Sequence, residues 1–323
     1  MRVSVVAPTN RRPDLLDRCL AALLAQDIDP CDYEVIVADD AVCDATRRQV
    51  ERWARCGVAR GHTIRYLPAT RGQGPAAARN RGWRAARGPI IAFTDDDCVP
   101  VPGWLRAGLT ACAPDVAGVM GRIVVPVPHR PTDYERDAAR LTTAEFVTAN
   151  CFYRRDALAS AGGFDERFTA AWREDSDLFF TLMECGARLA HAPDAVVVHP
   201  IRPARWGVSL AQQRKSMFNA LLYKKHPALY RRRVQAAPPW RYYVAVAALL
   251  TSAAGHVRQR RADAFLSECV WLIVTARFCA RRLRGTSHAP RHVAEMAVTS
   301  ALIPPLAIYW RLRGALTFHV WFI

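Results

Sequence analysis

The stretch Pro89-Ile-Ile-Ala-Phe-Thr-Asp-Asp-Asp97 is a short apolar run that ends in three carboxylates. Its four apolar residues, 90–93, are typical of a buried strand in a parallel sheet. Because side chains alternate along an extended backbone, Asp95 and Asp97 are predicted to project to one side and Asp96 to the other. Neighbouring carboxylates repel one another, so they are either solvated or neutralised by a divalent cation that also binds a diphosphate.

Apolar and amphipathic segments alternate on the N-terminal side of this stretch. Strands are predicted at residues 3–7, 33–38 and 64–67, and helices at residues 13–26, 45–55 and 76–86. The alternation favours an α/β fold with a Rossmann-like, mostly parallel sheet and right-handed crossovers. Ligands of such sheets lie beyond the carboxyl ends of the strands. Residues 9–11, 39–40 and 95–97 all follow predicted strands, so they are expected to meet at one crevice.

One glycine motif offers an alternative ligand. The spacing Gly72-x-Gly74-x-x-Ala77 superficially matches the dinucleotide fingerprint, with Asp95 about 20 residues further on. The motif does not open the first strand-helix unit, and Pro75 interrupts it, so it is a weak indication of a nicotinamide or flavin site. The sequence contains no G-x-x-x-x-G-K-[ST] phosphate loop.

A second acidic cluster, Glu174-Asp-Ser-Asp177, precedes a predicted helix over residues 178–185. Acids at this position favour the helix dipole and serve as caps. An aspartate there can also stay ionised and accept a proton from a bound hydroxyl. His199 follows a strand predicted at residues 195–198, where it is either a surface residue or a metal ligand. Between the acidic clusters, residues 116–127 predict one or two strands and residues 128–140 a polar loop.

Charge is unevenly distributed along the 323 residues. Residues 201–323 hold 20 Lys and Arg against three acids, whereas residues 1–200 hold 25 basic and 26 acidic residues. We therefore predict a neutral domain at residues 1–205 and a basic helical region at residues 206–323. The ten cysteines include no C-x-x-C pair, which indicates a reduced compartment and argues against a zinc ribbon. The first apolar run is too short for a signal peptide, so the body is expected in the cytosol.

The basic region contains three apolar stretches, at residues 242–255, 269–276 and 296–310. The longest, of 14 and 15 residues, would make helices of about 22 Å, short of the roughly 30 Å of bilayer hydrocarbon. Pro304-Pro305 is expected to interrupt the last one. We expect helices that lie on, or dip into, an anionic inner leaflet. The alternative is a helical subdomain packed on the neutral domain. Nucleic-acid binding is disfavoured because long apolar runs separate the cations.

Four motifs occur in a fixed order along residues 1–200. They are Val-Val-Ala-Pro-Thr-Asn-Arg, Val-Ile-Val-Ala-Asp-Asp, Gly-Pro-Ala-Ala-Ala-Arg-Asn-Arg-Gly before Phe-Thr-Asp-Asp-Asp-Cys-Val-Pro, and Gly-Gly-Phe-Asp-Glu-Arg-Phe followed by Glu-Asp-Ser-Asp-Leu. Each motif is weak alone, but the ordered set resembles the family 2 glycosyltransferases, which have the GT-A fold. One departure is Ala41-Val-Cys43, where Gly-Ser-Thr is common in the family.

The resemblance implies roles for individual residues. It implies a donor site for the nucleotide-sugar formed by Pro8, Thr9, Arg11, Asp39, Asp40, Arg71, Arg79, Asp95 and Asp96. Asp95 and Asp97 match the family's D-x-D element, which places Mg2+ or Mn2+ on the diphosphate, and His199 is similar to a histidine that completes the metal shell. Asp175 matches the catalytic base of inverting members, with Glu174 beside it.

The chemistry of sugar transfer needs this equipment. Displacing a nucleoside diphosphate builds negative charge on the leaving oxygen, which a cation stabilises, and the acceptor hydroxyl must lose its proton to a carboxylate. The expected function is a metal-dependent inverting glycosyltransferase at the cytoplasmic face of the plasma membrane. It would move a sugar from a nucleotide diphosphate-sugar to a lipid-linked or cell-surface glycan acceptor. The alternatives are a membrane-associated binding protein with an inactive transferase-like domain, and a nucleotidyltransferase.

Overall fold

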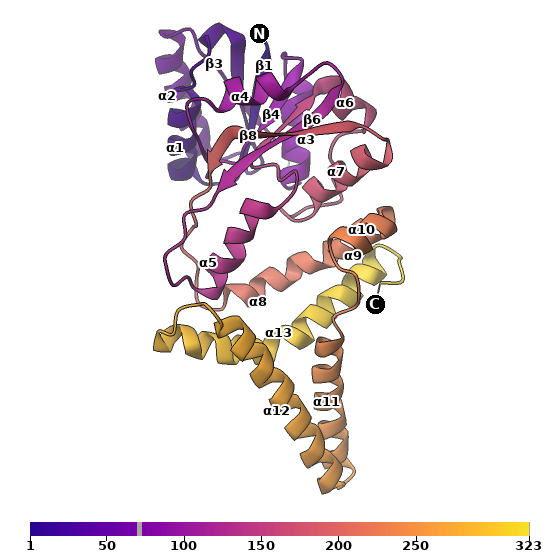
Figure 1. Ribbon diagram of the computed structural model, residues 1–323. Coiled ribbons are helices and arrows are strands. Elements are labelled where there is room, and N and C mark those ends of the chain that lie inside the picture. Colours follow the sequence, from indigo (N-terminus) through magenta and orange to yellow (C-terminus); the bar gives the residue numbers. More distant parts are fainter. Residues whose placement is uncertain (70–72, 323) are drawn as a thin grey trace. The chain divides into compact units, whose positions relative to one another are not determined.

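The structure is a computed structural model that describes residues 1–69 and 73–322 (Figure 1). The chain divides into two compact units. Unit 1 comprises Met1–Pro126 and Ala139–Ile201, and unit 2 comprises Val127–Ala138 and Arg202–Ile323. The short segment 127–138 therefore belongs with the C-terminal helices, although it lies in the middle of the sequence of unit 1.

Unit 1 is built on an eight-stranded sheet with the strand order β3-β2-β1-β4-β7-β6-β8-β5. The strands are β1 (Val3–Thr9), β2 (Tyr33–Asp39), β3 (Thr63–Pro68), β4 (Ile90–Phe93), β5 (Val99–Pro100), β6 (Val116–Val124), β7 (Cys151–Arg154) and β8 (Arg188–Val198). The first four strands in the spatial order are parallel, as predicted. β7 is antiparallel to β4 and β6, and β5 is antiparallel to β8, so the other half of the sheet is mixed. The α/β fold class is confirmed.

Helices connect these strands and bury their apolar faces. They are α1 (Pro13–Leu23), α2 (Asp44–Val58), α3 (Pro75–Ala85), α4 (Trp104–Ala111), α6 (Arg155–Ser160) and α7 (Glu174–Glu184), with short 3-10 turns η1 (Pro30–Asp32) and η2 (Ala139–Thr143). In α1, Leu16, Cys19, Leu20 and Leu23 are buried at helical spacing. All residues of β1 and β2 are buried, as expected for strands covered on both faces.

Between residues 128 and 198, three predictions of local structure are wrong. The polar segment 128–140 is not a loop throughout, because it contains α5 (Asp133–Ala138) and the start of η2. β8 begins at Arg188, before the predicted strand, because its polar first half pairs with β6. α7 begins at Glu174, so the acids predicted to precede the helix form its first turn.

A buried asparagine holds an irregular pairing between β6 and β8. The register shifts after Gly121, so that Ala192 and Val196 of β8 pair with consecutive residues of β6. The side-chain amide of Asn150 donates to the carbonyl oxygens of Arg122 at 2.9 Å and Ala195 at 2.8 Å. Its own oxygen accepts a hydrogen bond from Trp104 Nε1 at 2.8 Å. The bend that precedes the end of β8 is therefore fixed by one fully bonded side chain.

Unit 2 is helical. It contains α5, α8 (Val208–Gln212), η3 (Gln213–Met217), α9 (Phe218–Lys225), α10 (Pro227–Arg233), α11 (Trp240–Val257), α12 (Arg261–Leu283) and α13 (Pro290–Thr317). α5 is joined to this unit by Asp133, which accepts two hydrogen bonds from the buried guanidinium of Arg282, at 2.9 and 3.0 Å. Arg282 also donates to Thr299 Oγ1 at 2.6 Å and Ser300 Oγ at 3.2 Å.

α11 and α12 form a hairpin, seen in Figure 1 as two long helices that meet at their tip. Small residues of α11 face α12: Ala245, Ala248, Ser252 and Gly255 are buried. A Cβ added at Gly255 would lie 3.0 Å from Ala264, so the helices touch closely there. Large apolar side chains point outward instead, and the exposed ones include Trp240, Val244, Leu250 and Val257 on α11 and Phe265, Leu266, Leu272 and Ile273 on α12.

α13 is one continuous helix, so the predicted interruption at Pro304-Pro305 is wrong. Each proline removes one backbone donor, but the helix continues on both sides of the pair. Its 28 residues extend about 42 Å, longer than bilayer hydrocarbon. Among the described residues, α13 is the one helix whose length and composition would allow it to span a membrane. Of its most apolar 18-residue window, 39% is buried in the structure, less than in a core helix of a soluble protein, which is mostly buried.

Candidate active site

The carboxyl ends of β1 and β2 form one wall of the site. Thr9 and Asp39 end these strands as partners in register. Asp39 accepts hydrogen bonds from the backbone N–H groups of Ala41 at 2.9 Å and Cys43 at 2.7 Å, and from the Tyr66 hydroxyl at 2.8 Å. Asp39 therefore shapes the loop that follows it.

That loop departs from the family's Gly-Ser-Thr, and its backbone is unusual. Val42 has a left-handed φ of 51°, which a β-branched residue rarely adopts. Asp40 accepts from the backbone N–H groups of Gln73 at 2.9 Å and Gly74 at 3.1 Å, and so ties the loop to the start of α3. Pro8 is buried in β1, and Arg11 is exposed with a left-handed φ of 54°. Arg71 lies outside the described residues.

The three aspartates after β4 do not lie on extended backbone. The strand ends at Phe93, and the Cys98 N–H donates to the Asp95 carbonyl at 3.1 Å across a turn. The prediction that Asp95 and Asp97 project to one side and Asp96 to the other assumed an extended backbone, and that assumption is wrong because the aspartates lie in a turn. Each carboxylate has a different partner: Asp95 contacts Arg79, Asp96 contacts Thr9 and Arg12, and Asp97 contacts His199.

Asp96 is buried against the end of β1. It accepts a hydrogen bond from Thr9 Oγ1 at 2.7 Å and pairs with Arg12 at 3.2 Å. Burial raises the pKa of Asp96 to about 6, although Arg12 and Thr9 both favour its ionised form. Asp96 and Thr9, both predicted to contact the donor, are thus bonded to each other. The sequence analysis did not single out Arg12 as the partner of Asp96, because nothing in the sequence distinguishes Arg12 from the adjacent Arg11.

Arg79 joins the two acidic clusters. Its side chain is 3% exposed, and it contacts Asp95 at 2.7 Å and Glu174 at 3.0 Å. These carboxylates come from the turn after β4 and the first turn of α7, so the two acidic clusters meet at Arg79. The resemblance implied that Arg79 contacts the nucleotide-sugar, whereas in this structure its guanidinium bridges Asp95 and Glu174.

Glu174 and Asp175 differ in their surroundings although they are adjacent. Burial, followed by the charge of Asp175, raises the pKa of Glu174 to about 7. Burial also raises the pKa of Asp175, whose side chain is only half-buried and accepts from the Ser176 N–H at 2.7 Å. Arg173, directly before α7, has a left-handed φ of 78°. Strained backbone of this kind is common at functional sites.

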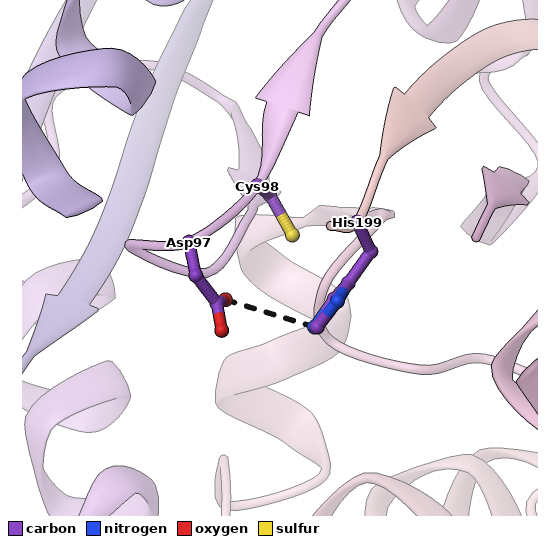
Figure 2. Close-up of side chains that lie close together, drawn as sticks. All are labelled: Asp97, Cys98 and His199. Carbon is purple, nitrogen blue, oxygen red and sulfur yellow. Dashed lines mark ion pairs between the residues drawn. The ribbon is translucent and has the colours of Figure 1, made fainter. Parts of the chain in front are cut away.

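A second group of side chains gathers at the end of β8. Ligand atoms of Asp97, Cys98 and His199 all lie within 4.8 Å of one another (Figure 2). His199 Nε2 is 3.6 Å from a carboxylate oxygen of Asp97. Carboxylate and imidazole are both common ligands of divalent cations, so the donor set fits a metal ion. Two of the three predicted metal ligands meet here, whereas Asp95 is held by Arg79.

The family match covers a large part of the chain. Residues 4–171 match the model of Glycosyl transferase family 2, and residues 90–309 match that of Glycosyl transferase family group 2. Glycosyltransferase AglE of Haloferax volcanii is 28% identical over 213 residues, which are 62% of this chain and 67% of that protein. The pre-mycofactocin glycosyltransferase of Mycobacterium tuberculosis is 34% identical over 216 residues, 62% of this chain but 43% of the relative.

Solved structures share the fold at low sequence identity. The mannosyltransferase PcManGT from Pyrobaculum calidifontis, in complex with GDP-Man and Mn2+, has a TM-score of 0.56 at 21% identity, covering 98% of this chain and 87% of its own. S. aureus TarS 1–349 in complex with UDP has a TM-score of 0.52 at 15% identity, covering 93% and 90%. Since the first family match spans just over half of the sequence, the chain belongs to glycosyltransferase family 2 and has the GT-A fold.

Proposed function

We propose that this protein is a metal-dependent, inverting glycosyltransferase that uses a nucleotide diphosphate-sugar and a lipid-linked or cell-surface glycan acceptor. The observation that carries the proposal is that acids distant in the sequence meet at Arg79 and at His199. Asp95 and Glu174 share the guanidinium of Arg79, and Asp97, two residues after Asp95, lies beside His199. The complex of PcManGT with GDP-Man and Mn2+ supports a donor and a cation of this kind.

The nucleotide would bind at the ends of β1 and β2. Asp39 and Asp40 set the shapes of the two loops there through backbone hydrogen bonds. Pro8 and Arg11 flank the same strand end, and Arg71 belongs to the same proposed donor set. Thr9 and Asp96, bonded to each other, would keep the wall rigid. In this proposal Arg79 positions the acids rather than touching the sugar.

Asp97 and His199 would hold the cation, which we propose to be Mg2+ or Mn2+. When bound, such a cation neutralises the charge that builds on the leaving diphosphate. Asp95 would act beside it, oriented by Arg79. The ion pair also keeps two carboxylates from facing one another without compensation.

Asp175 is our candidate for the catalytic base. Its raised pKa makes it a stronger proton acceptor than an ordinary surface aspartate, and its partial exposure leaves it accessible to an acceptor hydroxyl. Glu174 is buried against Arg79 and would position the first turn of α7. A single displacement assisted by one base inverts the anomeric centre.

Asp175→Asn tests this assignment. The amide keeps the shape but cannot accept the proton, so we expect kcat to fall by about 10²–10⁴-fold with little change in the donor KM. Release of nucleoside diphosphate would be measured across a panel of nucleotide-sugars, with membrane extract as acceptor and with Mg2+ or Mn2+ titrated. Full turnover by Asp175→Asn would remove the proposed base. Donor binding by the wild type without transfer or hydrolysis would favour an inactive binding protein.

Unit 2 would associate with the cytoplasmic face of the membrane. Its basic composition suits anionic lipid, and the α11–α12 hairpin buries small residues while exposing large apolar ones, the reverse of a soluble helix pair. Exposed apolar surface of this extent on a basic element favours a lipid partner. We propose peripheral or shallow insertion, with α13 packed within the unit.

A further inference from the structure

Cys98 is placed at the candidate metal centre by strand pairing. β5 and β8 are antiparallel, with Val99 opposite Val198 and Pro100 opposite Val197. One step further along this register brings Cys98 opposite His199. Residues opposite one another in an antiparallel pair send their side chains to the same face of the sheet. Figure 2 shows the Cys98 sulfur projecting toward the side chains of Asp97 and His199.

We propose that Cys98 is a third protein ligand of this centre and that its sulfur narrows the proposed choice between Mg2+ and Mn2+ to Mn2+, the more thiophilic of the two. The inference rests on the proposed function in one respect, namely that Asp97 and His199 hold a metal ion. A sulfur ligand from Cys98 would also set the order in which the centre prefers divalent cations. A site with one sulfur, one nitrogen and one carboxylate oxygen suits Zn2+ and Co2+ best, then Mn2+, and Mg2+ least.

The distances suit this set of ligands. The 3.6 Å between His199 Nε2 and the Asp97 oxygen is close to the ligand-to-ligand distance of about 3.4 Å in a tetrahedral site with bonds of about 2.1 Å. The Cys98 sulfur lies within 4.8 Å of both other ligand atoms. A shift on the order of 1 Å, within the range of side-chain adjustment, would complete three protein ligands. The fourth position would stay open, as in catalytic metal sites.

Cys98 could instead be a small apolar residue of the core, since it is fully buried. Cys19 provides the contrast: it is equally buried and contacts the Asp95 carbonyl oxygen at 3.5 Å, but it lies outside the cluster of ligand atoms. A core residue would affect stability without changing which cation binds. A ligand would affect the choice of cation even when stability is preserved.

The experiment is a Co2+ titration of the full chain, followed by ultraviolet and visible absorption. We expect the wild type to show thiolate-to-cobalt charge transfer and the visible bands of a four-coordinate ion, both saturating at one equivalent. Cys98→Ser and Cys98→Ala should lose the charge transfer and bind Co2+ and Zn2+ about tenfold or more weakly, with Mg2+ affinity within about twofold. Cys112→Ser, a partly buried cysteine outside the site, is the matched control. Thermal melting would confirm that each variant folds.

The outcomes separate this inference from the proposed function. If Asp97→Asn and His199→Ala abolish Co2+ binding but Cys98→Ser keeps the wild-type spectrum and cation order, the sulfur is not a ligand and the inference is overturned. If the wild type binds no divalent cation, both the inference and the proposed metal dependence are overturned. A sulfur-dependent spectrum in a protein that never turns over a nucleotide-sugar would support the ligand and count against the transferase.

Discussion

Arg79 is buried between two carboxylates that lie far apart in the sequence of unit 1. Burying a charge is costly unless partners satisfy it, and removing one partner is costlier still. Arg79 therefore requires Asp95 and Glu174 to be in place when the chain folds. The motif alone could identify Arg79 as a site residue. It could not distinguish a substrate contact from a bridge, because that depends on α7 arriving from nearly a hundred residues away.

Glu174 should make the stability of the protein depend on pH. Its pKa is raised to about 7 in the folded state, from 4.5. The folded protein therefore holds a proton that the unfolded chain releases, and the free energy of unfolding should fall as pH rises from about 4.5 through about 7. Asp96, with a pKa raised to about 6, acts in the same direction.

Urea unfolding at pH 5 and pH 8 would measure this effect. We expect Glu174→Gln to reduce the difference in unfolding free energy between the two pH values by about 1–3 kcal/mol. Glu51→Gln, at an exposed acid on α2, is the control and should leave the difference unchanged. An equal pH dependence in the wild type and Glu174→Gln would contradict the assignment.

The elements that carry the site were predictable to different degrees. β1, β2 and β4 are mostly apolar runs, and their ends place Thr9, Asp39 and Asp95 at one edge. The turn after Phe93 and the two-residue strand β5 have no such signal, because they depend on pairing with β8. Cys98 was therefore missed, although it directly follows the aspartates. The first half of β8 was missed because its polar residues conceal a strand that β6 stabilises.

Asn150 should affect the candidate metal centre although it is not one of the candidate ligands. Asn150→Ala would leave Trp104 Nε1 and two backbone carbonyl oxygens without this partner, so we expect a loss of about 2–4 kcal/mol in unfolding free energy. Because Asn150 fixes the bend of β8 before His199, metal affinity should also fall. Trp104→Phe, which removes one of the three hydrogen bonds, should leave metal affinity near that of the wild type.

Urea unfolding and equilibrium dialysis with Mn2+ would test this pair of variants. A stable Asn150→Ala protein would show that the irregular pairing holds without its side chain. Unchanged Mn2+ binding in a destabilised Asn150→Ala protein would separate the bend of β8 from the position of His199.

At the scale of the whole molecule, the charge contrast between the two parts was evident from composition, and so were helices in the second part. The length of α13 was not, because a proline pair normally ends a helix. The arrangement of the α11–α12 hairpin was not evident from the sequence either, since composition does not tell which face of an apolar helix packs inward.

Vesicle binding should depend on that hairpin. Leu250 and Leu272 are 66% and 61% exposed, so replacing both with glutamate should cost little stability but place two charges on the surface that we propose to face lipid. We expect roughly tenfold or weaker binding to phosphatidylglycerol vesicles, and salt should weaken wild-type binding. Val58→Glu, at a 71% exposed residue of unit 1, is the matched control. Equal co-sedimentation of all three proteins would argue against the hairpin as the lipid contact.

The segment 127–138 has an evolutionary consequence, because it belongs to unit 2 but lies between two parts of unit 1 in the sequence. The chain crosses between them three times, and Asp133 in that segment compensates the buried charge of Arg282. A protein ended at residue 201 would retain α5 without its partners, and a tail grafted onto another transferase would arrive with an uncompensated arginine. Recombination at a single breakpoint therefore cannot exchange this tail, and the two units should be inherited together.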